Sequence, residues 1–232
     1  MKIRVKFSKI GAVRFIGHLD VMRYFQKAVR RAGIAVRYTE GYSPHQVMSF
    51  AAPLGLGDTS ECEYMDIDVE MSISGEEMKR RLNEVMVEGI EVLSCRCLPK
   101  GRQNAMAAMA AADYRLSFQE GCGPENPNLF FAGLLQFAGQ EEIRIVKKTK
   151  KSEKEVNIRP LIYSLDVRDS RIFCRVSAGS VDHLKPERIV EAYCEKAGIS
   201  LPPFALIVHR MELYAKKEDG SLISLEDLGE IF

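Results

Sequence analysis

The stretch Arg14-Phe15-Ile16-Gly17-His18-Leu19-Asp20, with the amphipathic helix that it opens, organises the first part of this 232-residue chain. Its glycine permits a tight backbone approach, and its aspartate falls in the first helical turn, where the helix dipole favours a negative charge. The helix is predicted to run to about Ala32 and to stop at Gly33. Apolar residues that recur every three or four positions are predicted to form its buried stripe: Leu19, Met22, Phe25, Val29 and Ala32.

The opposite side of this helix is predicted to be cationic. Its basic residues are spaced at i, i+4, i+7 and i+8: Arg23, Lys27, Arg30 and Arg31. The loop over 40–49 beyond the helix carries Tyr42 and His45 among Gly, Ser and Pro. The basic helix and the aromatic loop come from adjacent elements, so they are expected to converge. Loops carry binding residues more often than cores do, which makes this loop a candidate for ligand contact.

The pattern of the first hundred residues predicts a strand, a helix, two strands, a helix and a strand. The first strand, over 2–8, is predicted to be half-buried, because Ile3 and Val5 alternate with Arg4 and Lys6. This order is the βαββαβ, or ferredoxin-like, pattern. The second half repeats the order of elements without obvious sequence identity. The sequence therefore predicts an α+β fold of tandem ferredoxin-like domains with antiparallel sheets.

The predicted domain organisation follows from this repeat. An N-terminal ferredoxin-like domain over 1–100 is followed by a linker over 101–112, which is rich in small residues. A C-terminal ferredoxin-like domain over 113–216 carries a Lys-rich hairpin, and an acidic, peripheral tail over 217–232 completes the chain. Within the second domain, 156–167 is predicted to be one strand, with an edge or a bulge at its proline.

Charge is distributed unevenly behind a net charge of +1. Residues 1–60 hold ten Lys/Arg against three Asp/Glu, and residues 61–100 hold five against ten. Residues 144–159 hold seven against two. Two basic blocks with an acidic one between them indicate a side that faces a polyanion, although solvated charged faces are the plainer alternative.

Several function classes are disfavoured by what the sequence lacks. It contains no GxxxxGK[ST], GxGxxG, HExxH or GxSxG motif. The six cysteines are scattered without a CxxC pair, and no two histidines have a local metal-ligand spacing, so we expect reduced thiols, no metal and no cofactor. No apolar run approaches the roughly 18 residues of a membrane span, and no signal peptide is visible. The sequence predicts a soluble, cytoplasmic protein without a membrane partner.

Two groups of residues are candidates for function. His18 with Asp20 is a candidate oriented general base, with a helix-capping histidine as the alternative, and His45 is a candidate ligand contact in its loop. The candidates for nucleic-acid binding combine guanidinium, ammonium and ring side chains: Arg14, Arg23, Lys27, Arg30, Arg31, Tyr42, His45, Lys147, Lys148, Lys150, Lys151 and Arg159. Edge protection by the lysines is the alternative for the hairpin.

Segments of the chain resemble a known bacterial family. They include the opening stretch, Gly41-Tyr42-Ser43-Pro44-His45, and the segment from Lys150-Lys151 to Pro160. In these the chain resembles the radical SAM-linked protein family, a domain of unknown function that occurs alone or fused to cobalamin-type radical SAM proteins. The chain has Pro-His-Gln where the family pattern reads Pro-His-Pro. The resemblance implies a context near RNA-related functions and supplies no catalytic residues.

The function predicted from these features is an RNA-binding accessory module that acts with a radical SAM partner in tRNA or rRNA modification or processing. Two alternatives stay open. One is a metal-independent endoribonuclease that uses His18 or His45, by analogy with tandem ferredoxin-like enzymes that process CRISPR repeats. The other is a protein-interaction scaffold for a radical SAM enzyme. The sequence does not predict an oligomeric state.

Overall fold

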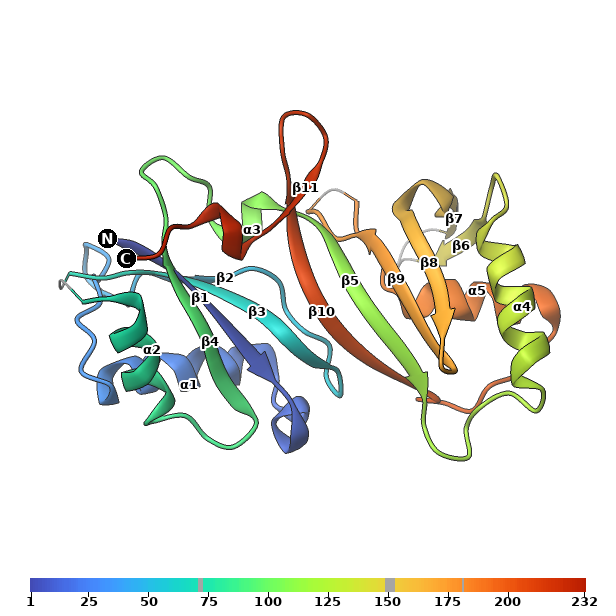
Figure 1. The fold of residues 1–232 in the computed structure, drawn as a ribbon, viewed down its shortest axis with the longest axis horizontal. Coiled ribbons are helices and arrows are strands. Elements are labelled where there is room, and N and C mark those ends of the chain that lie inside the picture. The colour runs from blue at the N-terminus through green and yellow to red at the C-terminus, as the bar shows by residue number, and fades with distance from the viewer. Residues whose placement is uncertain (71–72, 149–152, 181) are drawn as a thin grey trace. The chain divides into compact units, whose positions relative to one another are not determined.

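The computed structural model describes residues 1–70, 73–148, 153–180 and 182–232. The fold is α+β with a large, mostly antiparallel sheet, as the sequence predicted (Figure 1). The chain divides into two compact units, one made of 1–110 with 210–232 and the other of 111–209. Strand β10, Leu206–Lys216, contributes to both, because the boundary passes between His209 and Arg210.

In the first unit, β3 is the hub of the sheet. It pairs with β1 on one side and with β2 and β10 on the other, while β4 follows β1. The elements of this unit, besides β10 and the short 3-10 turns Gly11–Phe15 and Glu226–Leu228, are β1 (Lys2–Lys9), α1 (His18–Arg31), β2 (Met48–Phe50), β3 (Thr59–Asp68), α2 (Gly75–Asn83), β4 (Ile90–Cys97), α3 (Ala105–Ala108) and β11 (Leu222–Ser224).

The apolar core of the first unit lies where α1 and α2 cover the sheet. Phe7 of β1 packs on Phe25 of α1, with ring centroids 4.5 Å apart. The predicted stripe of α1 is confirmed for Phe25, Val29 and Ala32, which are buried. It is wrong for Leu19, which is 66 % exposed. At 3.6 residues per turn Leu19 lies about 120° from Phe25 around the helix, outside the stripe.

The other face of this sheet is ionic and also covered. Arg4 is 1 % exposed, and its Nε and Nη2 lie 2.8 and 2.9 Å from the two carboxylate oxygens of Asp66 on β3. Its Nη1 donates to the carbonyl oxygen of Leu225 at 2.9 Å, and the Ala105 amide donates to Asp66. The prediction of a half-buried first strand with Arg4 outward is therefore wrong, because residues distant in sequence cover that face.

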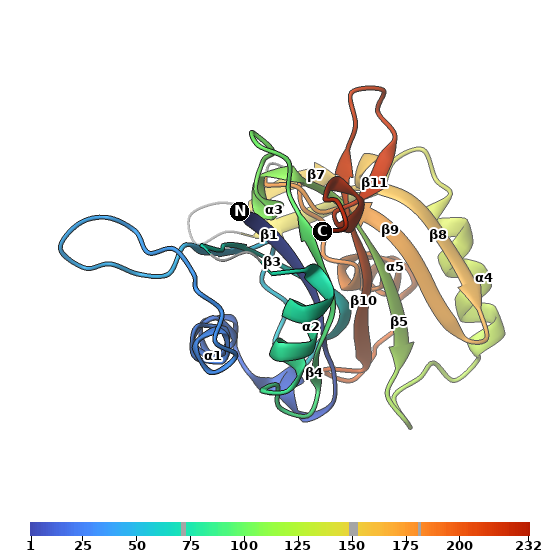
Figure 2. The ribbon, with the colours of Figure 1, turned by 60° about the vertical axis from the view of Figure 1, so that its left-hand side comes forward.

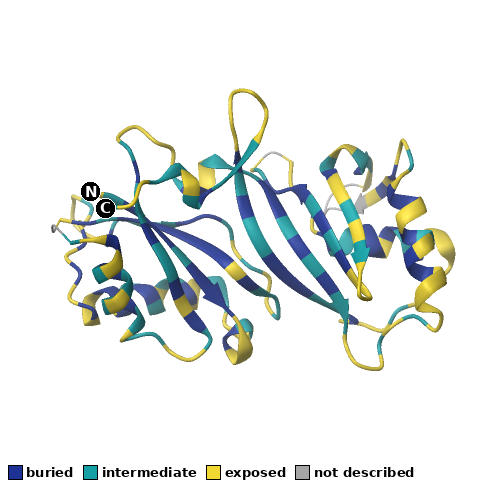
Figure 3. Cartoon of the chain, viewed as in Figure 1, coloured by how far each residue is buried: buried dark blue, intermediate teal, exposed yellow. Residues whose placement is uncertain are grey.

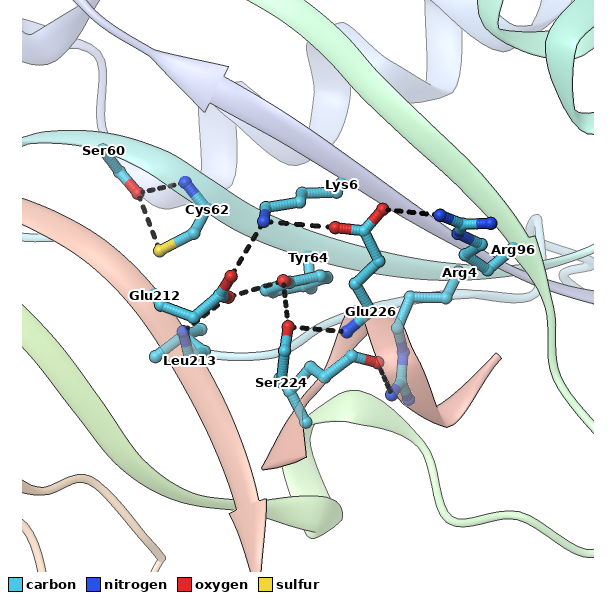
Figure 4. Close-up of polar contacts among 11 residues, drawn as sticks. Arg4, Lys6, Ser60, Cys62, Tyr64, Arg96, Glu212, Leu213, Ser224 and Glu226 are labelled. Carbon is cyan, nitrogen blue, oxygen red and sulfur yellow. Dashed lines mark hydrogen bonds and ion pairs between the residues drawn. The ribbon is translucent and has the colours of Figure 1, made fainter. Parts of the chain in front are cut away.

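Figure 4 shows the polar contacts on this second face. Lys6 Nζ lies 2.8 Å from Glu212 and 3.2 Å from Glu226, and Tyr64 Oη donates to Glu212 at 2.6 Å. Burial lowers the pKa of Lys6, but the hydrogen bond and charge of Glu212, aided by Glu226, outweigh burial and raise it. The two carboxylates thus favour the charged form of this half-buried ammonium.

The C-terminal segment belongs to the first unit and differs from the peripheral tail that the sequence predicted over 217–232. The backbones of Glu230 and Cys97 exchange two hydrogen bonds of 2.8 and 2.9 Å, and the Gly75 amide donates to the Phe232 carbonyl at 2.9 Å. The Phe232 ring packs against the apolar core. These contacts hold the segment over the ionic face.

The second unit has the strand order β10-β5-β9-β8, with the hairpin β6-β7 as a separate sheet. Its elements, besides β10 and the 3-10 turn Arg159–Leu161, are β5 (Met109–Phe118), α4 (Pro127–Ala138), β6 (Arg144–Lys148), β7 (Glu153–Asn157), β8 (Ile162–Arg168), β9 (Arg171–Ser177) and α5 (Glu187–Ala197). The strand predicted over 156–167 is two strands, because Pro160 sits in the 3-10 turn between them. In Figure 3 the strands are largely buried, and most exposed residues lie on helices and loops.

Replacing Asp66 by alanine is expected to lower the free energy of unfolding by about 3–5 kcal/mol, because the Arg4 guanidinium stays buried without its counter-charge. Glu70→Ala is the matched control, since the Glu70 carboxylate pairs with Arg37 at 3.6 Å with both side chains more than half exposed. That variant is expected to change stability little. Chemical denaturation measures both, and two equally small effects would contradict the structural role of the buried pair.

Candidate nucleic-acid interface

The turn that leads into α1 is held by a buried lysine. Lys9 at the end of β1 is 3 % exposed, and its Nζ donates to the carbonyl oxygens of Arg14 at 3.3 Å and Ile16 at 2.9 Å. Burial lowers the pKa of Lys9, although the charges of Glu63 and Asp58 act in the opposite direction. The segment that leads into α1 is therefore anchored to the sheet by an ammonium group.

The exposed side of α1 carries the four predicted cations. We call Arg23, Lys27, Arg30 and Arg31 the cationic face, and all four are exposed. Arg23 pairs with Asp20 at 3.4 Å, and Arg31 donates to the carbonyl oxygen of Val85 at 3.3 Å. In the described part of the chain, Lys27 and Arg30 take part in none of the ion pairs. Among the described residues, a carboxylate therefore neutralises Arg23 of the cationic face but not Lys27, Arg30 or Arg31.

Residues 37–47 form an arm that projects beside α1, and Figure 2 shows it as the long blue loop. Its two sides are joined by backbone hydrogen bonds, from Thr39 N to His45 O and from Val47 N to Arg37 O, both 2.8 Å. Gly41 at the turn has φ of +113°, a conformation that favours glycine. Tyr42 follows it and is fully exposed. The loop predicted from the sequence is thus a short two-stranded extension with a tyrosine at its tip.

The base of the arm is tied to α1 and to β3. Gln46 is 4 % exposed, and its Nε2 donates to the carbonyl oxygen of Gln26 in α1 at 3.3 Å. The Arg37 amide donates to the Asp68 carbonyl at the end of β3 at 2.8 Å. The base of the arm is therefore hydrogen-bonded both to the backbone of the helix that carries the cationic face and to the backbone of β3.

The two candidate histidines have different surroundings. His45 is exposed, and its Nδ1 lies 3.1 Å from the hydroxyl of Thr39, which also accepts from the His45 amide at 3.1 Å. His18 is half-buried, with its ring edge-on to Phe50 at 5.6 Å between centroids. The carboxylate of Asp20 pairs with Arg23. The geometry therefore orients His45 and gives no support to His18 with Asp20 as an oriented base.

The remaining predicted cations lie apart from these elements in the sequence. Lys147 and Lys148 are in β6, which pairs antiparallel with β7, whereas Lys150 and Lys151 lie outside the described residues. Arg159 donates from Nε to the Gln140 carbonyl at 3.0 Å and from Nη1 to the Ile162 carbonyl at 2.9 Å. The predicted phosphate contact at Arg159 is not supported, because its guanidinium is already used to hold backbone.

Arg14 is half-buried, and its guanidinium lies over the Phe15 ring at 4.7 Å from the centroid. The first unit thus gathers the cationic face, the arm and Arg14, while Lys147 and Lys148 belong to the second unit. Sequence reasoning missed Lys9 and Gln46, which position these elements. Lys9 is a basic residue at the end of a strand, and Gln46 is an amide residue in a loop. Neither pattern indicates from the sequence that the side chain is buried.

The described residues include all the cysteines and side chains of the types that bind metals. All six cysteines are free, and burial raises the pKa of both Cys95 and Cys174 to about 12. Within the described ranges no three His, Cys, Asp or Glu side chains gather as a metal site would need. No helix in that part of the chain is both long and apolar enough to cross a membrane.

Residues 2–186 match the model of a protein family described as "Uncharacterized protein conserved in bacteria (DUF2344)". No curated protein matches the sequence. The family match covers the whole of α1 and the arm, together with the β6-β7 hairpin.

Two solved structures are similar to the chain at low sequence identity. A chain in the crystal structure of a Cbf5-Nop10-Gar1 complex aligns with 91 % of this chain at 7 % identity and a TM-score of 0.47. The alignment covers 48 % of that chain, so the present chain spans about half its length. An unknown protein from Galdieria sulphuraria aligns over 90 % of this chain and 96 % of its own, at 12 % identity and a TM-score of 0.29. Both scores are too low to support a functional argument.

Replacing Thr39 by valine removes the hydroxyl that meets His45 while keeping the size of the side chain. We expect faster hydrogen exchange of the His45 amide, because its acceptor at 3.1 Å is lost. The Val47 amide, which donates to the Arg37 carbonyl at the base of the arm, is the internal control and is expected to keep its rate. Amide exchange followed by NMR measures both, and an unchanged His45 rate would show that this hydroxyl does not hold the arm.

Proposed function

The chain belongs to the bacterial protein family DUF2344, and we propose that this member is an RNA-binding module. The observation that carries the proposal is the cationic face of α1, where Lys27 and Arg30 are exposed and lack an ion-pair partner in the described part of the chain. Such cations bind phosphates with release of counterions, which favours association with a polyanion.

The layout of the cationic face suits a run of phosphates. Arg23 and Arg30 are seven residues apart, which corresponds to about 10 Å along the helix axis at 1.5 Å per residue. A row of cations at this spacing holds a backbone without reading its sequence. The arm then supplies Tyr42 and His45, whose rings and exposed polar atoms suit contacts to bases.

The β6-β7 hairpin is proposed as a second phosphate contact. Lys147 and Lys148 lie on β6, and Lys154 pairs with Lys147 across the hairpin. Lysines bind phosphate as hydrated point charges, so they suit backbone contact. Lys150 and Lys151 share this hairpin in the sequence and are included on that ground alone.

The partner in the proposal comes from the resemblance to radical SAM-linked proteins. A module that holds tRNA or rRNA would present it, in the cytoplasm, to a radical SAM enzyme that modifies it or to an allied processing step. The module needs no cofactor of its own for this role, because binding and presentation involve no bond making.

We also propose that each unit is a ferredoxin-like repeat. In the first, β1-α1-β2-β3-α2-β4 has the strand order β4-β1-β3-β2, and every recorded pair is antiparallel. In the second, β5-α4-β8-β9-α5-β10 has the order β10-β5-β9-β8, with β6-β7 as an insertion. Both orders are those of a split βαβ unit, which supports the tandem arrangement.

Charge reversal on α1 tests the proposal. Lys27→Glu and Arg30→Glu are each expected to weaken binding of RNA and to flatten the slope of log K against log salt by about one. Lys100→Glu is the matched control, because Lys100 is an exposed lysine on the loop after β4 and changes the net charge equally. Fluorescence anisotropy with total tRNA at several salt concentrations measures the effect.

Equal losses in all three variants would mean that net charge alone governs binding. Absence of RNA binding by the wild-type protein at low salt would overturn the proposal and leave the protein-interaction scaffold as the explanation. Co-purification of a partner that survives nuclease and high salt would then support the scaffold.

A second candidate function, metal-independent endoribonuclease, is favoured by one observation. His45 is exposed and has one ring nitrogen 3.1 Å from the Thr39 hydroxyl, as an oriented base would be. Such a base takes the proton of a 2′-hydroxyl, whose oxygen attacks the adjacent phosphorus. The 5′-oxygen leaves and takes a proton from water, and the imidazolium returns its proton to the hydroxide so formed. The products are a 2′,3′-cyclic phosphate and a 5′-hydroxyl.

If this candidate is correct, wild-type protein cleaves RNA in the presence of EDTA and His45→Ala does not, although it still binds. His18→Ala is expected to keep the activity, because His18 packs edge-on against Phe50. Gel analysis of the RNA, with detection of the cyclic phosphate, measures the outcome. Intact RNA after incubation with the wild-type protein would exclude His45 as a catalytic base.

A further inference from the structure

We propose that the RNA is recognised at unpaired nucleotides, and that Tyr42 at the tip of the arm is the residue on which a base stacks. The inference rests on the proposed function and names the class of RNA that the same surface selects. It distinguishes loops, bulges and single strands from continuous duplex.

The first argument is the placement of the ring. Tyr42 is fully exposed although the arm that carries it is ordered by hydrogen bonds on both sides. Single exposed apolar side chains are common on protein surfaces and need no explanation. Tyr42 differs because it follows the turn of the arm, whose base is tied through Gln46 to α1. Its ring contributes nothing to the core and is open to a ligand.

The second argument is the composition of the arm. Between residues 38 and 45 the sequence reads Tyr-Thr-Glu-Gly-Tyr-Ser-Pro-His, so every large side chain is aromatic or polar. Aromatic rings with polar edges are the side chains on which unstacked bases rest. Tyrosines also anchor protein interfaces, so composition is shared by both kinds of contact. The exposed cations of α1, to which Gln46 joins the base of the arm, favour RNA over a protein as the occupant.

The third argument concerns what a duplex offers to such an arm. In A-form RNA the bases are stacked inside and the major groove is too narrow for side chains. A tyrosine at a tip then meets phosphates, 2′-hydroxyls and the edges of stacked bases in the wide minor groove, but no free base face on which to stack. A base that is splayed out of a loop exposes its whole face, and stacking on it is worth a measurable part of the affinity.

His45 supplies the polar complement to the stack. One of its ring nitrogens is beside the Thr39 hydroxyl at 3.1 Å, which fixes the ring on the side of the arm. The imidazole is exposed, so the second nitrogen is placed to donate to or accept from the edge of a base. The arm thus offers a ring at its tip and a hydrogen-bonding group three residues further along.

The test compares two RNAs with the same number of phosphates, a stem–loop and a blunt duplex, by fluorescence anisotropy. The wild-type protein is expected to bind the stem–loop more tightly. Tyr42→Ala is expected to lose about tenfold in affinity for the stem–loop and little for the duplex, because stacking on one base is removed. Tyr42→Phe keeps the ring and is expected to retain wild-type affinity. Tyr163→Ala, at an exposed tyrosine of β8, is the matched control.

The salt dependence of the binding constant distinguishes this inference from the proposed function. Tyr42→Ala is expected to leave the salt slope unchanged, whereas Lys27→Glu flattens it. If Tyr42→Ala binds both RNAs like the wild type while Lys27→Glu weakens both, the inference is overturned and RNA binding stands. The same holds if Tyr42→Ala loses affinity only for a co-purified protein. If the wild type binds neither RNA at low salt, the proposed function itself has failed.

Discussion

The ion pair between Arg4 and Asp66 is the constraint on which the first unit depends. Burying a guanidinium is costly unless its charge and its N–H groups find partners, and here the Asp66 carboxylate and the carbonyl oxygens of Gln103 and Leu225 accept four hydrogen bonds from Arg4. These partners come from β3, from the segment before α3 and from the C-terminal segment. The pair therefore joins neighbouring strands to residues about 100 and 220 positions away in the chain. Arg4 and Asp66 are also opposite each other in the β1-β3 pairing, so the ion pair fits that register.

An ionic face on one side of the sheet and an apolar face on the other have different consequences for the chain. The apolar side tolerates side chains of similar volume, since burial is not directional. On the ionic side Lys6 must meet Glu212 and Glu226 at hydrogen-bond distance. The segments that carry these carboxylates can therefore pack on the sheet in one position only. The segment after β10 meets both requirements, because Glu226 reaches Lys6 while the backbones of Glu230 and Cys97 pair.

The sequence predicted those features that depend on local periodicity. The helix period placed Phe25 and Val29 inward and the cations of α1 outward, and the strand period grouped Arg4 with Lys6. Periodicity tells which side chains share a face, but not whether a distant segment covers it, so Arg4 was expected to be exposed. The same limit applies to Arg159, whose charge is visible in the sequence while the carbonyl oxygens that it holds are not.

The part of the site that could not be predicted is the set of buried contacts that hold it. The cationic face and the arm are surface features, yet both are held by buried side chains. Lys9 anchors the segment before α1, and Gln46 joins the arm to the middle of α1. Each anchor orders backbone in the free protein. Binding then requires less loss of conformational entropy from these segments, which leaves a more favourable free energy of binding. A flexible polyanion loses its own freedom on association, so a preformed partner is the arrangement that leaves most of the contact energy as affinity. Under the proposed function, the buried anchors Lys9 and Gln46 matter as much as the exposed cations, because they set where the cations and the arm lie.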